Sequence, residues 1–129
     1  MNLEKWGIAL GRLLLSAIFI VSGVYKVTGF TGTAGVMASM GIPLAKLALV
    51  ITILIEIGGG LLLLTGFKAR YAALALALYL VPVTLVFHNP IHQDQSVNFM
   101  KNLAIIGGLL VTAAASRSTE VAAAQTAGK

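Results

Sequence analysis

The chain has 129 residues, of which 58% are hydrophobic and only 10% are charged, and its mean hydropathy is +0.96. Such a composition offers too few polar residues to cover a folded core with a water-compatible surface, so the surface must face lipid. Cysteine is absent, which excludes disulfides, thiolate metal sites, iron–sulfur ligation and thiol redox chemistry by the chain itself. The net charge of +5 comes from basic residues that stand singly, so no nucleic acid partner is expected.

Four apolar segments each approach the length of about 20 residues that a helix needs to cross roughly 30 Å of hydrocarbon. The predicted spans are residues 7–26, 44–65, 70–88 and 98–115. The loop between the second and third spans is short, which forces these two helices to run antiparallel. The sequence therefore predicts an all-α membrane protein, a four-transmembrane-helix antiparallel bundle that forms a single domain over residues 1–115.

Two segments lie outside the predicted spans. Residues 28–43 are too rich in glycine and threonine to cross the membrane, and their apolar side chains indicate an external amphipathic segment at its surface. Residues 116–129 are rich in alanine, serine and threonine and are predicted to be a flexible cytoplasmic tail.

The orientation follows from the distribution of basic residues, because cytoplasmic loops carry an excess of lysine and arginine. An arrangement with both termini inside places six basic residues on or toward the cytoplasmic side, namely Lys5, Arg12, Lys68, Arg70, Arg117 and Lys129. It places three toward the outside, Lys26, Lys46 and Lys101. We therefore expect an N-in, C-in topology.

Ionisable residues within the spans are the candidates for function, because each is costly at the bilayer centre unless it is paired or hydrated. Glu56 lies about ten residues into the second span, hence roughly 15 Å deep, near the midplane. It is expected to face the bundle interior, either neutralised by a basic partner that fixes the helix register or engaged in ligand or proton binding. The expected partner is Arg12 from the cytoplasmic side or Lys101 from the outer side, and Lys101 is preferred.

The last span carries polar residues at its outer end. Asn98, Lys101 and Asn102 stand at i, i+3 and i+4, a single face that must turn toward the other helices. The predicted intramembrane polar site opens outward and consists of Arg12, Lys26, Glu56, His88, Asn98, Lys101 and Asn102.

The two histidines do not suggest a metal or haem site. Pro90 separates His88 from His92, so the two cannot share one regular helix face, and no second span presents a histidine. An interfacial His88 is either a solvated helix end or a participant in the polar site. No intrinsic cofactor or metal is expected.

Several short motifs resemble the DoxX family of four-helix bacterial inner-membrane proteins, and their order and spacing cover the chain up to about Ser116. They are GRLL at 11–14, SGVYKV at 22–27, MGIP at 40–43, EIGGG at 56–60, GF at 66–67, FH at 87–88 and FMKNL at 99–103. The resemblance implies a multi-pass protein of the inner membrane. It also implies a link to quinone, since some relatives are associated with quinone-linked oxidoreductases, notably as a subunit of thiosulfate:quinone oxidoreductase. The residues singled out for the family map onto Arg12, Lys26, Glu56, His88 and Lys101.

Two functions of different kinds are compatible with these residues. The first is a quinone-interacting or redox-accessory membrane subunit, in which Lys26, His88 or Lys101 hydrogen-bonds a quinone carbonyl and Glu56 relays protons. The second is a non-catalytic protein whose polar interior serves packing, lipid binding or complex assembly, and a minimal transporter is a third reading. A stand-alone enzyme is not expected, and the expected partners are the lipid bilayer, a membrane redox protein and, as an open question, further copies of the chain.

Overall fold

The computed structural model describes residues 3–87 and 96–128, except for the side chains of 117–123. The described residues form five α-helices and no strand. The helices are α1 (Leu3–Thr28), α2 (Phe30–Ser39), α3 (Ala45–Thr65), α4 (Ala69–Phe87) and α5 (Ser96–Ala127). Long helices suit an apolar chain in lipid, because a helix satisfies its backbone hydrogen bonds within itself.

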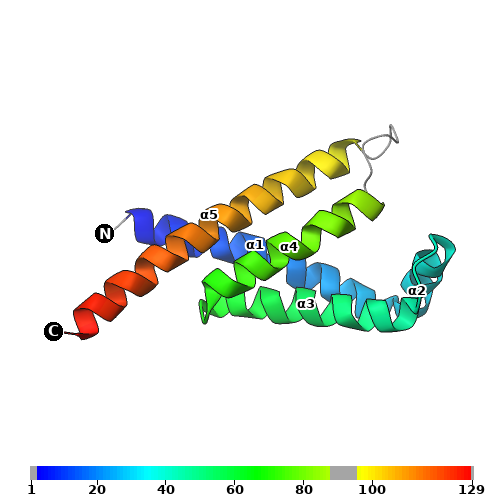
Figure 1. Cartoon of the computed structure of the whole chain (residues 1–129), viewed down its shortest axis with the longest axis horizontal. Coiled ribbons are helices and arrows are strands. Elements are labelled where there is room, and N and C mark those ends of the chain that lie inside the picture. The colour runs from blue at the N-terminus through cyan, green and yellow to red at the C-terminus, as the bar shows by residue number, and fades with distance from the viewer. Residues whose placement is uncertain (1–2, 88–95, 129) are drawn as a thin grey trace.

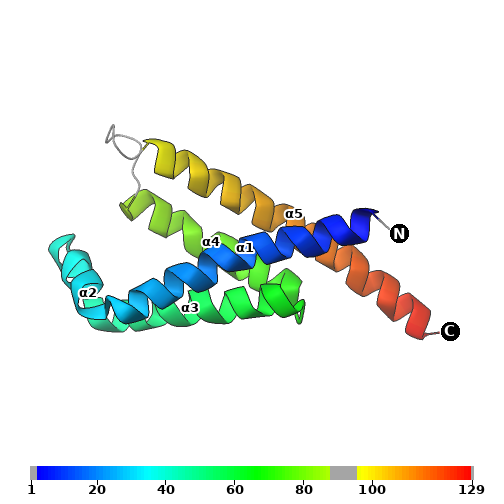
Figure 2. The ribbon, with the colours of Figure 1, turned by 180° about the vertical axis from the view of Figure 1, so that it is seen from behind.

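Four of the five helices, α1, α3, α4 and the part of α5 up to Ser116, are long and apolar enough to cross a membrane. The predicted all-α, four-span membrane fold is therefore confirmed. Consecutive spans run in opposite directions, and both termini lie at the end of the bundle opposite α2 (Figure 1, Figure 2). Which end faces the cytoplasm stays a prediction from the basic residues.

The helices pack most extensively in two pairs, α1 with α3 and α4 with α5. Helices α3 and α4 meet at the short loop that joins them and diverge toward the other end, where α2 lies beside α3 (Figure 1). This divergence separates α3 from α4 at the end of the bundle that carries α2 (Figure 1).

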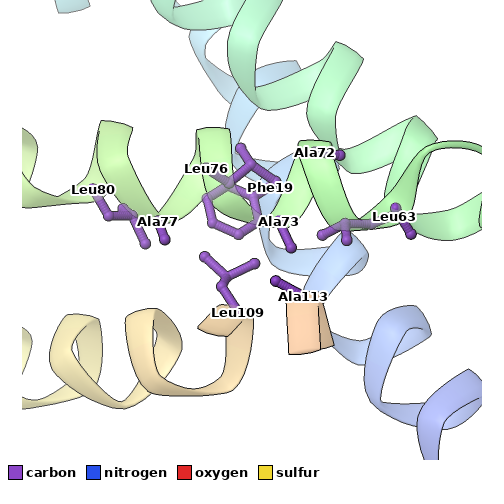
Figure 3. Packing of buried hydrophobic residues seen from close by; sticks show 10 residues of the cluster. Phe19, Leu63, Ala72, Ala73, Leu76, Ala77, Leu80, Leu109 and Ala113 are labelled. Carbon is purple, nitrogen blue, oxygen red and sulfur yellow. The ribbon is translucent and has the colours of Figure 1, made fainter. Parts of the chain in front are cut away.

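The main core lies where all four spans come together. Phe19, Leu63, Leu76 and Leu109, one from each span, pack there (Figure 3). Helix α4 contributes mostly alanines, and their small side chains let neighbouring helices approach closely.

Two glycines of the triplet at residues 58–60 of α3 lie against two different helices. A Cβ on Gly59 would lie 2.9 Å from Leu76 of α4, and one on Gly60 would lie 2.7 Å from Ile20 of α1. Nothing lies within 4 Å of the Cβ position of Gly58. Two adjacent glycines thus bring α3 against α4 on one side and α1 on the other.

The segment expected to lie on the membrane surface contains α2. Ala34 and Met37 of this helix are buried against Leu49 of α3, and Phe87 from the end of α4 packs against the same cluster. Helix α2 is therefore docked on the bundle and covers the N-terminal end of α3.

The C-terminal segment is helical in the structure. The sequence predicts a flexible cytoplasmic tail over residues 116–129, whereas α5 continues without a break to Ala127 and is 32 residues long. At 1.5 Å per residue such a helix is about 48 Å long, well beyond the hydrocarbon thickness of roughly 30 Å.

Candidate intramembrane polar site

An ion pair between α1 and α3 forms the centre of the site. The Nζ atom of Lys26 lies 3.1 Å from both Oε1 and Oε2 of Glu56. Lys26 also donates a hydrogen bond of 2.7 Å to the hydroxyl of Ser22, one turn earlier on α1. The Glu56 side chain is only 6% exposed, whereas that of Lys26 is 27% exposed, so the carboxylate is enclosed while the ammonium group borders open space.

A third helix contributes a phenol to the same carboxylate. The hydroxyl of Tyr79 on α4 donates a hydrogen bond of 2.7 Å to Oε1 of Glu56. Tyr79 was not among the predicted site residues. The signal in the sequence is a tyrosine within residues 72–80 of the third span, which are otherwise alanine and leucine.

The backbone approach of α1 and α3 explains why Lys26 reaches Glu56. A Cβ on Gly23 would lie 2.5 Å from Cγ1 of Ile57 and 3.5 Å from Cβ of Glu56, so only the missing side chain of Gly23 allows this contact. Lys26 follows Gly23 by three residues and therefore projects from the same side of α1. The close crossing thus places the lysine directly over the carboxylate.

An open cavity of about 540 Å³ lies beside the ion pair, between the end of α1, α2, α3 and α4. Its polar wall includes Lys26, Thr52 and Tyr79, and its apolar wall includes Met37 and Phe87. A second open cavity, of about 430 Å³, borders Lys26 from the side of Ser22 and Tyr25. The ammonium group of Lys26 therefore contacts the buried carboxylate on one side and borders a cavity large enough for a ligand on the other.

Lys101 does not take part in this site, and the predicted pairing of Lys101 with Glu56 is wrong. Lys101 is exposed, and Lys26 forms the ion pair instead. The predicted polar face of the last span is therefore only partly turned inward. Its Asn102 donates a hydrogen bond of 3.1 Å to the buried Thr84 on α4, and Asn98 is half-buried.

Arg12 also does not reach Glu56, so the alternative pairing is wrong as well. Its guanidinium group lies against Gly66, at the C-terminal end of α3 and far along the helix from the carboxylate. His88 lies outside the described residues. The structure therefore divides the described part of the predicted set into three places. These are a site around Lys26 and Glu56 beside α2, an Asn102–Thr84 contact between α4 and α5, and a separate Arg12 at the end that carries the termini.

The described residues contain no group of three or more His, Asp or Glu side chains with the spacing of a metal site. The site instead combines one ammonium, one carboxylate, one phenol and one alcohol. Such a set can donate hydrogen bonds to an acceptor in the cavity and hold a proton between its members.

The sequence matches the DoxX family over residues 7–89, which is more than half of the chain. The chain belongs to the DoxX family. The matched range covers α1 to α4 and therefore includes every residue of the Lys26–Glu56–Tyr79–Ser22 cluster. No solved structure matches this DoxX chain.

Two relatives in Escherichia coli (strain K12) are similar to this DoxX chain over most of its length. The inner membrane protein YqjF is 42% identical over 113 residues, which cover 87% of this chain and 85% of the relative. The inner membrane protein YphA is 31% identical over 112 residues, which cover 81% of this chain and 79% of the relative. Together with the four apolar helices, these matches make the chain an integral protein of the inner membrane.

Proposed function

We propose that this DoxX protein binds a lipid-phase quinone in the cavity beside Lys26 and serves as an accessory subunit of a membrane redox complex. The observation that carries the proposal is the partly exposed ammonium group of Lys26 at the wall of an open cavity of about 540 Å³ within the membrane-spanning region. Charged residues within membrane-spanning segments, such as the paired Lys26 and Glu56, are rare and generally functional.

The walls of the cavity suit a ring with carbonyl oxygens and an apolar substituent. The three N–H groups of Lys26 face Ser22 and the two oxygens of Glu56, and Lys26 can turn one of them from the second carboxylate oxygen to a carbonyl oxygen in the cavity. Val36, Met37, Val83 and Phe87 supply apolar surface around it. Ligand sites typically combine such mostly apolar walls with a few convergent polar groups.

Glu56 and Tyr79 would act behind Lys26. Glu56 would hold the ammonium group of Lys26 in place at the cavity wall, and the Tyr79 hydroxyl fixes one oxygen of the carboxylate. Reduction of a quinone takes up two protons and two electrons. The Lys26–Glu56–Tyr79 group lies where it can pass protons to a bound carbonyl, whereas the two electrons would come from the redox partner protein that the proposal includes.

The proposal is tested by extracting quinone from protein purified in mild detergent and comparing Lys26→Met with Lys101→Met. Wild type and Lys101→Met should retain quinone in near-stoichiometric amounts, and Lys26→Met should lose most of it. Lys101 is a matched control because it is a lysine near the outer end of a span but is exposed. Wild-type protein without quinone, or equal retention by both variants, would refute the proposal.

A structural role is the second candidate, and one observation favours it. Lys26 already donates hydrogen bonds to Ser22 and to both oxygens of Glu56. An ion pair whose only role is to hold α1 against α3 would show the same contacts. If this is the whole role, Lys26→Met should reduce thermal stability without removing any bound molecule. Measuring quinone content and thermal stability on the same preparations separates the two functions.

A further inference from the structure

Arg12 is a charged residue on the buried side of α1 that belongs to no part of the Lys26 site. The residues that follow it at i+4, i+7 and i+11, namely Ser16, Phe19 and Gly23, are all buried. Arg12 therefore faces the other helices, at the end of the bundle that carries the termini.

The guanidinium group of Arg12 lies on the turn between α3 and α4. A Cβ on Gly66 would be 2.5 Å from Nη1 and 3.1 Å from Cζ of Arg12. Gly66 ends α3 with a φ of +83°, and its N–H bonds to the carbonyl of Leu62 at 2.9 Å. Because both spans meet at this turn, Arg12 lies at the level where the hydrocarbon gives way to the head groups.

No counter-charge for Arg12 is found in the part of the chain that the structure describes. Its Nε atom is buried and has no hydrogen-bond partner among those residues, and the carboxylate of Glu56 pairs with Lys26. The Arg12 side chain as a whole is half-buried. A partly buried cation without an anion is unfavourable, so the site lacks an acceptor that carries negative charge.

The surroundings of Arg12 are basic and aromatic. Lys68 follows Gly66 in the same turn, and its ammonium group lies 5.7 Å from the ring centre of Phe67. Phe67 is 65% exposed and Tyr71 is 56% exposed, and aromatic rings of this kind gather at the head-group level of membranes. The leucines of α1 beside Arg12, Leu13 and Leu14, are also exposed, so the site borders lipid.

We propose that Arg12 binds the phosphate group of an anionic phospholipid at the end of the bundle that carries the termini. The planar guanidinium group matches phosphate oxygens through paired hydrogen bonds. Lys68 adds attraction from the rim, and the exposed rings of Phe67 and Tyr71 lie where the glycerol backbone of a lipid would pass. Lipid phosphate is the occupant, since the site opens beside the lipid-facing leucines of α1.

The experiment measures thermal unfolding of detergent-purified full-length protein with phosphatidylglycerol, with phosphatidylcholine of the same acyl chains, or with inorganic phosphate. Wild type should be stabilised by phosphatidylglycerol and little by the other two. Arg12→Gln should weaken the apparent affinity for phosphatidylglycerol at least about fivefold, since a basic side chain near an anionic lipid surface contributes about that factor. Arg12→Lys should keep part of the response, and Lys101→Gln, at the opposite end, should keep all of it.

The same variants distinguish lipid binding from a structural role of Arg12. Without anionic lipid, Arg12→Gln should be as stable as wild type, because the variant removes a half-buried charge that has no counter-charge among the described residues. The proposal is overturned if Arg12→Gln keeps the full response, if inorganic phosphate stabilises as well as the lipid, or if Arg12→Gln is strongly destabilised in the absence of lipid. The last result would show that the arginine merely caps the C-terminal end of α3.

Discussion

Lys26 and Glu56 are 30 residues apart in sequence, yet the Nζ atom of Lys26 lies at 3.1 Å from each carboxylate oxygen of Glu56. The pair joins α1 to α3 inside the membrane-spanning region, where an unpaired charge is far less tolerable than in water. The contribution of each partner is therefore best measured by removing them singly and together.

Glu56→Gln should lower the free energy of unfolding by about 3 kcal/mol, because it leaves the Lys26 ammonium group without its carboxylate. Adding Lys26→Met should recover part of this loss, with a coupling energy of about 1 kcal/mol or more. Chemical or thermal unfolding of wild type, both single variants and the double variant completes the cycle. Glu56→Gln combined with Lys101→Met serves as the control, and strictly additive effects for the Lys26 pair would contradict the prediction.

Gly60→Ala should destabilise the protein by about 1 to 3 kcal/mol, since the new methyl group would press on Ile20 and on the backbone carbonyl of Ser16. Gly58→Ala is the matched control two residues away. Nothing lies within 4 Å of its Cβ position, so its effect should stay within about 0.5 kcal/mol or be stabilising. Equal losses in the two variants, read from unfolding midpoints, would show that α1 and α3 do not cross as described.

The docking of α2 can be measured with thiol reagents, because the wild-type chain has no cysteine. Met37 is 6% exposed and packs against Leu49, whereas Ser39 on the same helix is exposed. A cysteine introduced at position 37 should therefore react about tenfold or more slowly than one at position 39. Detergent-unfolded protein, in which both should react alike, gives the reference, and comparable rates in the folded protein would indicate that α2 detaches from the bundle.

Reporter fusions test the predicted orientation. A reporter active only in the cytoplasm should be active after Lys129 and inactive when inserted after Gly41, and one active only outside should give the opposite pattern. The physical reason is the excess of lysine and arginine at the end that carries the termini. Opposite activities would leave the four spans intact and reverse the protein in the membrane.

The number and order of the spans could be predicted because hydrophobic length alone fixes them. The C-terminal segment could not, since its low hydrophobicity was interpreted as disorder. Its alanines are strong helix formers, and α5 has already formed when the chain reaches Ser116, so extending it requires no new nucleation. The hydrophobicity of the sequence thus predicts where the last span ends within α5, but it does not predict where the helix itself ends.

The candidate site was predicted in part. Counting residues along each span placed Glu56 at depth, and its burial confirms that it faces the interior. The same counting offered Arg12 or Lys101 as its partner and preferred Lys101, whereas the choice falls on Lys26. That choice depends on the close crossing of α1 and α3 at Gly23, and on the divergence of α4 and α5 from α3, neither of which appears in one-dimensional spacing.

The unbroken course of α5 past Ser116 has a mechanical consequence. Eleven further helical residues, to Ala127, extend about 16 Å from the end of the span. When the membrane-spanning part of α5 tilts, this helical extension tilts with it and moves any group attached at its C-terminal end. A flexible segment would not transmit the tilt. A fluorophore near the C-terminus should therefore report a narrow range of distances from the bilayer surface, and that range should shift as a unit when bilayer thickness changes the tilt of α5.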